Sequence, residues 1–342
     1  MSFQIQLQPS GITFAADENR PVLDSAIDAN VTLPYGCRGG FCGACKGKVL
    51  QGQVDLGKAP EQSLPISERE AGFALLCCAK PQSNLLVDIK GASQTAAVVP
   101  PKQFPCRVNH LERLAGDVMR VMLQLPASET FAFRAGQYID ILLDNGLRRS
   151  FSIANAPSVK SELELHIRLI PGGHFTPTVF DGMKPRDILR VEGPFGTFWL
   201  REESLKPIVM LAGGTGFAPL KALVEHAIHL GVKRPVTLYW GARSPDGLYL
   251  HKLAQSWQSS LPHFRYIPVI SESRQNDGWT GQRGLVHEAV LADFADLSQH
   301  EVYACGAPPM IEAARNSFTQ QRGLPPEEFF SDAFTFAARA HS

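Results

Sequence analysis

The pattern of apolar and polar residues changes twice along the chain, and its first part predicts a small domain built on a sheet. FQIQLQP and GITFAAD, near the N-terminus, alternate apolar and polar residues around a Pro-Ser-Gly turn, which indicates a β-hairpin. A short stretch with helical spacing follows, and residues 47–56 and 84–91 are again strand-like. We expect a β-grasp-like domain over residues 1–92, which is a normal size for a domain.

After this domain the pattern changes to a linker and then to a series of short strands. Residues 93–103 are small and uncharged up to Lys102, and Pro100-Pro101 blocks regular structure. Residues 104–203 contain strand-like stretches with turn residues between them, at 106–114, 117–126, 137–143, 148–155, 163–171 and 187–194. Many short strands at even spacing predict a six-stranded antiparallel β-barrel.

Over residues 204–342 apolar strands alternate with helices. The strands are expected at 207–213, 235–243, 264–271 and 301–306, and the helices at 218–231, 248–261, 285–294 and 309–323. Such alternation predicts an α/β domain with a parallel sheet, whose ligands bind at the carboxyl ends of the strands. The fold class predicted for the whole chain is therefore multi-domain α+β.

Composition and charge narrow the classes of partner. The 342 residues include 33 Lys and Arg and 33 Asp and Glu, so the net charge is zero and no strongly basic surface for nucleic acid is expected. No apolar run approaches the length of a membrane span. The N-terminal MSFQIQLQPSG lacks a charged region followed by an apolar core, so we expect no signal peptide and a cytoplasmic location.

Four cysteines carry the most specific chemical pattern in the chain. Cys37, Cys42 and Cys45 have the spacing C-x4-C-x2-C, and 31 residues separate Cys45 from Cys77. This is the plant-type spacing of a [2Fe–2S] cluster. Glycines at positions 36, 39, 40 and 43 let the backbone curl around a buried inorganic core, with its N–H groups directed at sulfur.

Other interpretations of these thiols stay open. Structural zinc sites usually have two paired C-x2-C units or Cys and His pairs, whereas one C-x2-C is present and no histidine precedes His110. Disulfides are disfavoured because nothing indicates secretion. Cys77 and Cys78 are adjacent, so either could be the fourth ligand, and we favour Cys77.

Two glycine-containing motifs follow strands of the expected parallel sheet. Residues 213–219 (GGTGFAP) connect a strand to a helix, where glycines let the backbone approach a pyrophosphate and the helix N-terminus favours its charge. Cys305 ends another strand and would lie near a cofactor bound at that edge. Without a ligand, the first motif would be a tight turn and Cys305 a small buried residue.

Two further motifs lie among the expected barrel strands. In RSFSIAN, Arg149 can pair with a phosphate, and Phe151, two residues on, can stack on a flat ring. Gly172-Gly173 precedes Thr176 in a turn whose backbone and hydroxyl donors suit a pyrophosphate. The alternatives are an ordinary amphipathic strand and a hairpin turn.

Taken together, these motifs resemble the ferredoxin–NAD(P)⁺ reductase superfamily with a plant-type ferredoxin fused at the N-terminus, and the resemblance covers essentially the whole chain. RSFS is similar to the family's flavin motif, although Phe151 stands where Tyr is commoner. The resemblance implies that Arg149 holds the FAD pyrophosphate, that Phe151 stacks on the isoalloxazine and that Ser152 lies near its reactive N5. It implies further flavin contacts from HIRL and from the phosphate turn, at His166, Arg168, Leu169, Gly173 and Thr176.

The resemblance also assigns the nucleotide side. It implies that NAD(P)H is lined by residues of GGTGFAP and CGAPPM, namely Gly214, Thr215, Gly216, Cys305 and Gly306, although Ala307 stands where Pro is common. Ser152 and Cys305 are the residues implied nearest the reacting atoms, and Phe334 of the SDAF segment is implied near the flavin. Glu272 follows a strand in the region that meets the adenosine ribose, which favours NADH, while Arg274 favours NADPH.

This domain order is similar to that of CDP-6-deoxy-Δ3,4-glucoseen reductases and of the reductases of aromatic and alkane oxygenases. It implies that electrons pass from NADH to FAD, to the [2Fe–2S] cluster and then to a partner protein, because a flavin accepts a hydride and releases single electrons. The partner would be a dehydrase or, alternatively, an oxygenase component. Two other hypotheses are a redox sensor with a structural ferredoxin domain and a zinc-containing flavoprotein without one-electron output.

Overall fold

The computed structural model describes residues 1–94, 99–127, 130–159, 161–272 and 278–334. The chain forms two compact units. Unit 1 comprises Met1–Pro101 with Phe195–Phe198 and the short segment that begins at Ser331, and unit 2 comprises Lys102–Pro194 and Trp199–Phe330.

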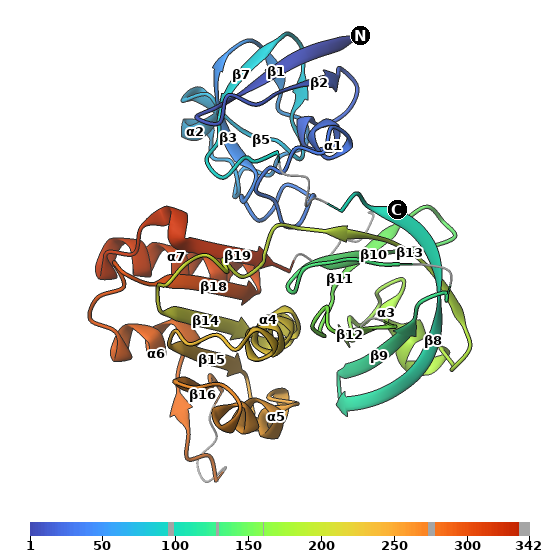
Figure 1. The fold of residues 1–342 in the computed structure, drawn as a ribbon, viewed down its shortest axis with the longest axis vertical. Coiled ribbons are helices and arrows are strands. Elements are labelled where there is room, and N and C mark those ends of the chain that lie inside the picture. The colour runs from blue at the N-terminus through green and yellow to red at the C-terminus, as the bar shows by residue number, and fades with distance from the viewer. Residues whose placement is uncertain (95–98, 128–129, 160, 273–277, 335–342) are drawn as a thin grey trace. The chain divides into compact units, whose positions relative to one another are not determined.

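Unit 1 is built on a five-stranded mixed sheet with the order β2-β1-β7-β3-β5 (Figure 1). Its strands are β1 (Ser2–Gln8), β2 (Thr13–Asp17), β3 (Lys46–Gln51), β5 (Phe73–Leu75) and β7 (Leu85–Asp88). A second, two-stranded sheet pairs β4 (Val54–Asp55) with β6 (Lys80–Pro81), and two short helices are α1 (Val22–Asp28) and α2 (Ile66–Glu70). The central pair, β1 and β7, is parallel, while β2 and β3 pair antiparallel with their neighbours.

The alternation of apolar and polar residues along the first strands explains which side chains of this sheet are buried. Ile5 and Leu7 on β1 are buried, and their polar neighbours along the strand are exposed. The apolar face of α1, including Val22 and Leu23, is buried as well. The expected hairpin and helix are therefore present, whereas α2 and β5 lie in a stretch for which we predicted no element.

Unit 2 contains a six-stranded sheet with the order β11-β10-β13-β8-β9-β12 (Figure 1). Its strands are β8 (Lys102–Ala115), β9 (Val118–Gln124), β10 (Tyr138–Leu142), β11 (Arg148–Ser152), β12 (Glu162–Arg168) and β13 (Ile188–Phe195), with α3 (Thr176–Asp181) between the last two. Neighbouring strands pair antiparallel where β8 meets β9 and β13, where β9 meets β12 and where β10 meets β11. Its strands contribute to a hydrophobic core that includes Val121, Ile139 and Leu165.

The expected closure of this sheet into a barrel is wrong. In the described residues its outer strands, β11 and β12, share no hydrogen-bonded ladder, and one isolated bridge joins Ile153 to Leu165. The strand number followed from the spacing of short apolar stretches. Closure depends on the stagger and tilt of the strands, which that spacing does not encode.

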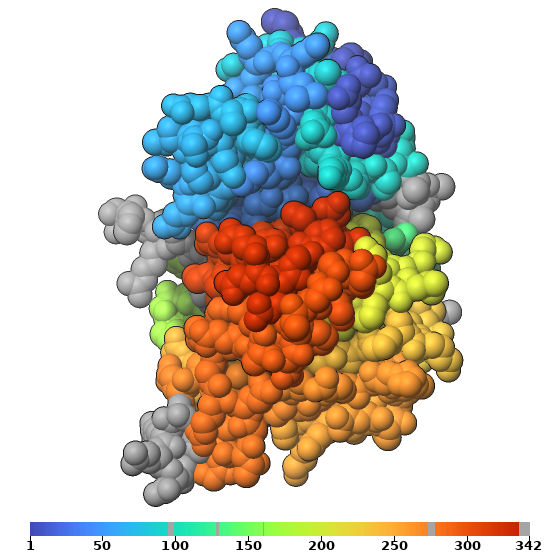
Figure 2. All heavy atoms as spheres, turned by 90° about the vertical axis from the view of Figure 1, so that its left-hand side faces the viewer, coloured from blue at the N-terminus to red at the C-terminus, as the bar shows by residue number. Residues whose placement is uncertain are grey.

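The second six-stranded sheet of unit 2 has the order β17-β16-β15-β14-β18-β19. Its strands are β14 (Ile208–Gly213), β15 (Val236–Ala242), β16 (Phe264–Ile270), β17 (Gln282–Arg283), β18 (Glu301–Gly306) and β19 (Phe329–Ala333). The helices are α4 (Phe217–Leu230), α5 (His251–Ser256), α6 (Val286–Asp293) and α7 (Pro308–Arg322). Strands β14, β15, β16 and β18 pair in parallel as predicted, and β17 adds a further parallel strand. Helices α6 and α7 contact each other and belong to the orange-to-red part of the chain in Figure 2.

The register of this parallel sheet brings two of the predicted motifs to one edge. β14 lies between β15 and β18, and Ala212 on β14 pairs with Cys305 on β18. The loop after β14 and the end of β18 therefore meet at the carboxyl edge, where parallel sheets bind their ligands. No helix within the described part of the chain is long and apolar enough to cross a membrane.

Candidate functional site

The cysteine loop of unit 1 directs backbone N–H groups at one sulfur. The amides of Gly39, Phe41 and Cys42 each donate to Cys37 Sγ at 3.4 Å. The loop can turn this sharply because Gly40 has a φ of 84° and Gly43 a φ of 71°, in the left-handed region that glycine adopts without strain. This is a local environment that favours a thiolate over a thiol.

The thiols of the predicted cluster ligands meet in two pairs. Hydrogen bonding from the Cys42 thiol, followed by the loop amides, lowers the pKa of Cys37 to about 5 and correspondingly raises that of Cys42. The Cys45 thiol raises the pKa of Cys77 in the same way. Cys45 and Cys77 are buried, and Cys37 and Cys42 are partly buried. In the described residues, no single point gathers three or more Cys, His, Asp or Glu side chains around one metal ion.

The fifth thiol, Cys78, lies beside this group but in a different position. The Cys78 Sγ is 3.7 Å from the Cys77 Sγ. A Cβ added to Gly40 would lie 2.7 Å from the Cys78 Sγ. Cys78 Sγ therefore packs against the loop at Gly40, whereas Cys77 contacts Cys45.

In unit 2, β11 separates two sets of side chains on its two faces. Arg149 and Phe151 are half-buried on one face, where Phe151 lies 5.7 Å from the Phe175 ring. On the other face, Arg148 pairs with Glu192, and Ser150 Oγ donates to Asp140 at 2.6 Å. Ser152, at the end of the strand, is buried.

A turn after β12 holds the other predicted flavin contacts. The Ile170 N–H donates to Thr176 Oγ1 at 2.9 Å, and the Gly173 N–H donates to the Ile170 carbonyl at 2.9 Å. A Cβ on Gly173 would lie 3.0 Å from that carbonyl, so the turn is tight enough to favour glycine. The Leu169 N–H donates to the Asp117 carbonyl at 2.8 Å, which fixes the start of the turn.

The nucleotide motifs are brought together at the carboxyl ends of β14 and β18. A Cβ on Gly216 would lie 2.1 Å from the Cys305 carbonyl oxygen, so a side chain there would displace the backbone of β18. Gly214 and Gly306 have positive φ angles of 53° and 149°. Backbone atoms of the two motifs therefore lie in direct contact at this edge, and Thr215 and Cys305 are buried.

Arg168 connects this edge to the turn after β12. Its Nη1 would be 2.7 Å from a Cβ on Gly214, so the guanidinium lies directly on the loop between β14 and α4. Its Nε is 3.2 Å from Asp117 Oδ2. The predicted flavin and nucleotide residues therefore meet at Arg168.

Two further predicted residues, Glu272 and Phe334, follow the strands β16 and β19. Glu272 follows β16, and its carboxylate is 3.5 Å from Arg243 Nε, with both side chains largely exposed. The sequence interpretation missed Arg243, although its place directly after β15 could have indicated it. Arg274 lies outside the described residues. Phe334 follows β19 and is half-buried, in a segment that belongs to unit 1.

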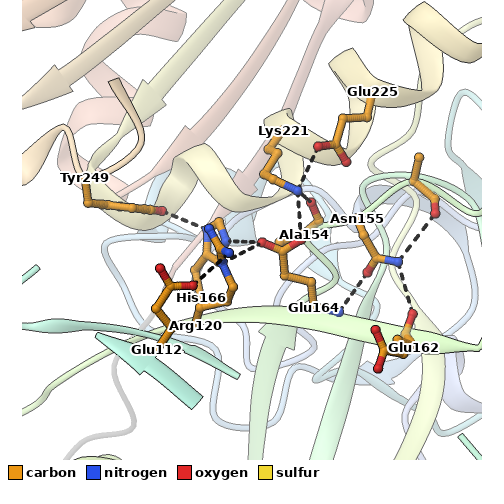
Figure 3. A network of polar contacts seen from close by, with 11 residues as sticks. Glu112, Arg120, Ala154, Asn155, Glu162, Glu164, His166, Lys221, Glu225 and Tyr249 are labelled. Atoms are coloured by element: carbon orange, nitrogen blue, oxygen red, sulfur yellow. Dashed lines mark hydrogen bonds and ion pairs between the residues drawn. The ribbon is translucent and has the colours of Figure 1, made fainter. Parts of the chain in front are cut away.

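His166 has a different setting from the other predicted flavin residues. Its ring is fully buried, with Nε2 2.9 Å from Glu164 Oε1 and Nδ1 3.0 Å from the Tyr249 hydroxyl (Figure 3). Burial lowers the pKa of His166 and so favours the neutral ring. The imidazole is therefore engaged by the protein itself, in a buried polar network that sequence analysis did not anticipate.

Three family models match consecutive parts of the chain. A 2Fe-2S iron-sulfur cluster binding domain matches residues 5–82, an oxidoreductase FAD-binding domain matches 105–199 and an oxidoreductase NAD-binding domain matches 210–316. Each matched region contains the corresponding motif, namely the cysteine loop, the RSFS strand or the GGTGFAP and CGAPPM segments.

Known proteins are similar to this chain over nearly its full length. It is 42% identical over 334 residues to the CDP-6-deoxy-L-threo-D-glycero-4-hexulose-3-dehydrase reductase of Yersinia pestis, covering 98% of this chain and 99% of that protein. It is 36% identical over 338 residues to reductase component 1 of the terephthalate 1,2-dioxygenase of a Comamonas species, covering 98% of each. The crystal structure of an Amycolatopsis cytochrome P450 reductase matches with a TM-score of 0.81 and 32% identity, covering 98% of this chain and 100% of that one.

Proposed function

Because the chain belongs to the family of oxidoreductases that combine a [2Fe–2S] domain with FAD- and NAD-binding domains, we propose that it is an NADH-dependent reductase that delivers single electrons to a partner protein. The observation that carries the proposal is the occurrence of all three sites in one chain that aligns with a dehydrase reductase over 98% of its length. We place the domains at residues 1–92, 104–203 and 204–342, with a linker at 93–103.

The residues at the cysteine loop fit a [2Fe–2S] cluster. A two-iron cluster takes two thiolates on each iron, and the thiols pair as Cys37 with Cys42 and as Cys45 with Cys77. The amides directed at Cys37 Sγ are donors of the kind that stabilise thiolate charge. We assign these four cysteines as the cluster ligands and Cys78 as a neighbour.

The residues of unit 2 fit a flavin and a pyridine nucleotide at adjoining positions. Arg149 and Phe151 share a face of β11. On that face the guanidinium could bind a phosphate and the aromatic ring could stack on a flat ring. The backbone at Gly173, with Thr176, would receive the FAD pyrophosphate, and Leu169 and the backbone of His166 would line the flavin. Ser152 would lie near the reactive ring nitrogen, and we assign Phe334 to the flavin as well.

The glycine-containing backbone at the carboxyl ends of β14 and β18 would hold NADH. Gly214, Thr215 and Gly216 would contact its phosphates, and Cys305 with Gly306 would border the nicotinamide. Arg168, which lies on Gly214, would contribute charge where both cofactors meet. Bound FAD would supply an acceptor for the hydride of NADH that can release electrons singly, as a [2Fe–2S] cluster requires. The protein contributes position and electrostatics and supplies no acid or base to that exchange.

We propose that the acceptor is a dehydrase acting on a nucleotide-linked deoxyhexulose, by similarity to the Yersinia pestis reductase. The alternative is the oxygenase component of a multicomponent dioxygenase, by similarity to the Comamonas reductase. Purified protein with NADH should restore turnover of a CDP-hexulose dehydrase that lacks its own reductase. Restoration of a dioxygenase, with no effect on the dehydrase, would support the alternative instead.

A further inference from the structure

Lys221 is a buried lysine on α4 whose ammonium reaches across to the sheet that carries the flavin motif (Figure 3). Its Nζ donates to the Ala154 carbonyl at 3.0 Å and to Glu164 Oε2 at 2.8 Å. A third acceptor, Glu225 Oε1 one turn along the same helix, is 2.8 Å away. The three N–H groups of the ammonium thus have three acceptors, which is what a buried lysine needs to remain charged.

Two of those acceptors lie on the flavin side, Ala154 in the RSFSIAN motif and Glu164 on β12. Ala154 lies two residues after Ser152, and its own N–H donates to the Glu164 carbonyl at 2.7 Å. The Glu164 N–H donates in turn to Asn155 Oδ1 at 2.8 Å. Lys221 therefore bonds to a segment around Ala154 that is already hydrogen-bonded to β12.

The other end of the connection is the nucleotide loop. α4 begins at Phe217, directly after Gly214–Gly216, and the Phe217 ring stacks on Trp240 with a centroid separation of 3.7 Å. Trp240 Nε1 donates to the Gly214 carbonyl at 2.9 Å. The start of α4 and the loop that precedes it are thereby fixed to each other.

A second set of contacts connects the nucleotide loop, residues 214–216, to Glu164. The Tyr249 ring packs edge-on against Trp240 at 5.1 Å, and the Tyr249 hydroxyl is 3.0 Å from His166 Nδ1. Because the buried ring is neutral and its Nε2 faces the Glu164 carboxylate, Nε2 carries the proton and Nδ1 accepts from Tyr249. Glu164 is thus bonded directly to Lys221 of α4 and is connected to the loop after β15 through the ring of His166.

We propose that Lys221 is a positioning residue for hydride transfer, with Glu164 as its anchor, and that the pair sets the distance between the flavin strand and the nucleotide loop. This inference rests on the proposed function. Neither side chain contacts a cofactor in our assignment, so the effect is exerted through the backbone at Ala154 and at the start of α4. Such spacing matters because a misplacement of roughly 1 Å can slow a reaction by about 100-fold.

The test compares flavin reduction by NADH in the purified holoprotein and in Lys221→Met, which keeps the length of the side chain and removes its charge and donors. Anaerobic stopped-flow at saturating NADH should give a limiting rate of flavin bleaching that is lower by roughly 10- to 100-fold. The dissociation constant for NADH and the FAD content should stay close to those of the wild type. Amide hydrogen exchange in residues 152–156 of the same protein should become faster.

Two further variants separate positioning from a general loss of packing. Glu225→Gln removes a charge beside Lys221, but its amide oxygen can still accept from Lys221 and from the Ala156 N–H, so the rate of flavin bleaching should stay unchanged. Lys221→Arg should recover much of the rate, since its guanidinium can still bridge to Glu164. If Lys221→Met does not fold because Glu164 loses its lysine partner and keeps only Arg120 and His166, the double variant with Glu164→Gln removes that buried charge. It should be as slow as expected for Lys221→Met.

The outcomes are distinct. A Lys221→Met protein that bleaches at the wild-type rate, or one that loses FAD or NADH affinity in proportion to its rate, overturns the inference. A Glu225→Gln protein as slow as Lys221→Met also overturns it, because the charge of Glu225 rather than the bridge from Lys221 to Glu164 would then set the rate. Failure of NADH to reduce the flavin in the wild type would instead contradict the proposed function.

Discussion

Glu272 and Arg243 lie opposite each other at the ends of two neighbouring parallel strands, with Glu272 Oε1 3.5 Å from Arg243 Nε and the Glu272 N–H bonded to the Arg243 carbonyl at 2.9 Å. Both side chains are largely exposed. This edge therefore presents one carboxylate and one guanidinium, which favour different coenzymes. A carboxylate accepts from the ribose 2′-OH of NADH and repels the 2′-phosphate of NADPH, whereas a guanidinium binds that phosphate.

The first prediction concerns coenzyme choice. We expect kcat/KM to be higher with NADH than with NADPH and Glu272→Gln to reduce that ratio, because it removes the charge that repels the 2′-phosphate. Arg243→Ala should change the ratio in the opposite direction. Steady-state ferricyanide reduction with each coenzyme measures both effects. A wild-type preference for NADPH would contradict the assignment. An unchanged ratio in Glu272→Gln would show that Glu272 does not cause the preference for NADH.

The second prediction distinguishes the adjacent thiols. Cys77→Ser should abolish the [2Fe–2S] cluster, because Cys77 contacts Cys45 and completes the second thiol pair. Cys78→Ser should keep the cluster, since the Cys78 thiol packs on the loop at Gly40. Iron and sulfide content and the electron paramagnetic resonance signal of the reduced protein are the measurements. Loss of the cluster in Cys78→Ser but not in Cys77→Ser would reverse the ligand assignment.

The third prediction concerns two adjacent arginines on β11. Arg149→Ala should weaken FAD binding roughly 10- to 150-fold, because a charge-assisted phosphate contact contributes about 1.5–3 kcal/mol. Arg148→Ala is the matched control, since Arg148 pairs with Glu192 on the opposite face and should leave FAD binding intact. Flavin fluorescence on titration of the apoprotein gives both dissociation constants. Equal losses in the two variants would argue against a specific role for Arg149.

The fourth prediction concerns pH and the buried histidine. Burial lowers the native pKa of His166, so the unfolded chain takes up a proton near pH 6.5 that the native state resists. The stability from the neutral ring is therefore complete above about pH 6.5 and is lost as the pH falls below it, by at most about 1.4 kcal/mol per pH unit.

His166→Gln tests this sign directly. The variant should be less stable than the wild type at pH 8, and the difference in the free energy of unfolding should narrow towards pH 5.5. Urea unfolding at several pH values gives that difference, in which contributions from other histidines cancel. A difference that is constant or widens as the pH falls would show that His166 is not held neutral.

The sequence predicted the features that depend on short-range pattern. Gly216 and Cys305 each follow an apolar strand, and parallel strands place their carboxyl ends at one edge, so their meeting could be anticipated. The cysteine loop could be identified because its spacing is specific to one kind of cluster. Predicting these features requires only the type and the order of the secondary-structure elements.

Features that depend on long-range packing were not predictable in the same way. Lys221 has Glu225 four residues on, a spacing that usually means an exposed helical pair, and nothing local indicates that Lys221 is buried against Glu164. His166 was assigned to the flavin as part of HIRL, but its ring is directed at Tyr249, 83 residues away in sequence. Closure of the β11–β12 edges likewise depends on the shape of the whole sheet.

The measurement that tests the central claim most directly is the order in which one equivalent of NADH reduces the two redox centres under anaerobic conditions. Rapid-mixing absorbance should show flavin bleaching first, and freeze-quenched samples should then show the electron paramagnetic resonance signal of the reduced cluster. In Cys45→Ser, flavin bleaching and ferricyanide reduction should persist while cytochrome c reduction is lost. Reduction of the cluster before the flavin, or full cytochrome c reduction in Cys45→Ser, would contradict transfer from NADH through FAD to the cluster.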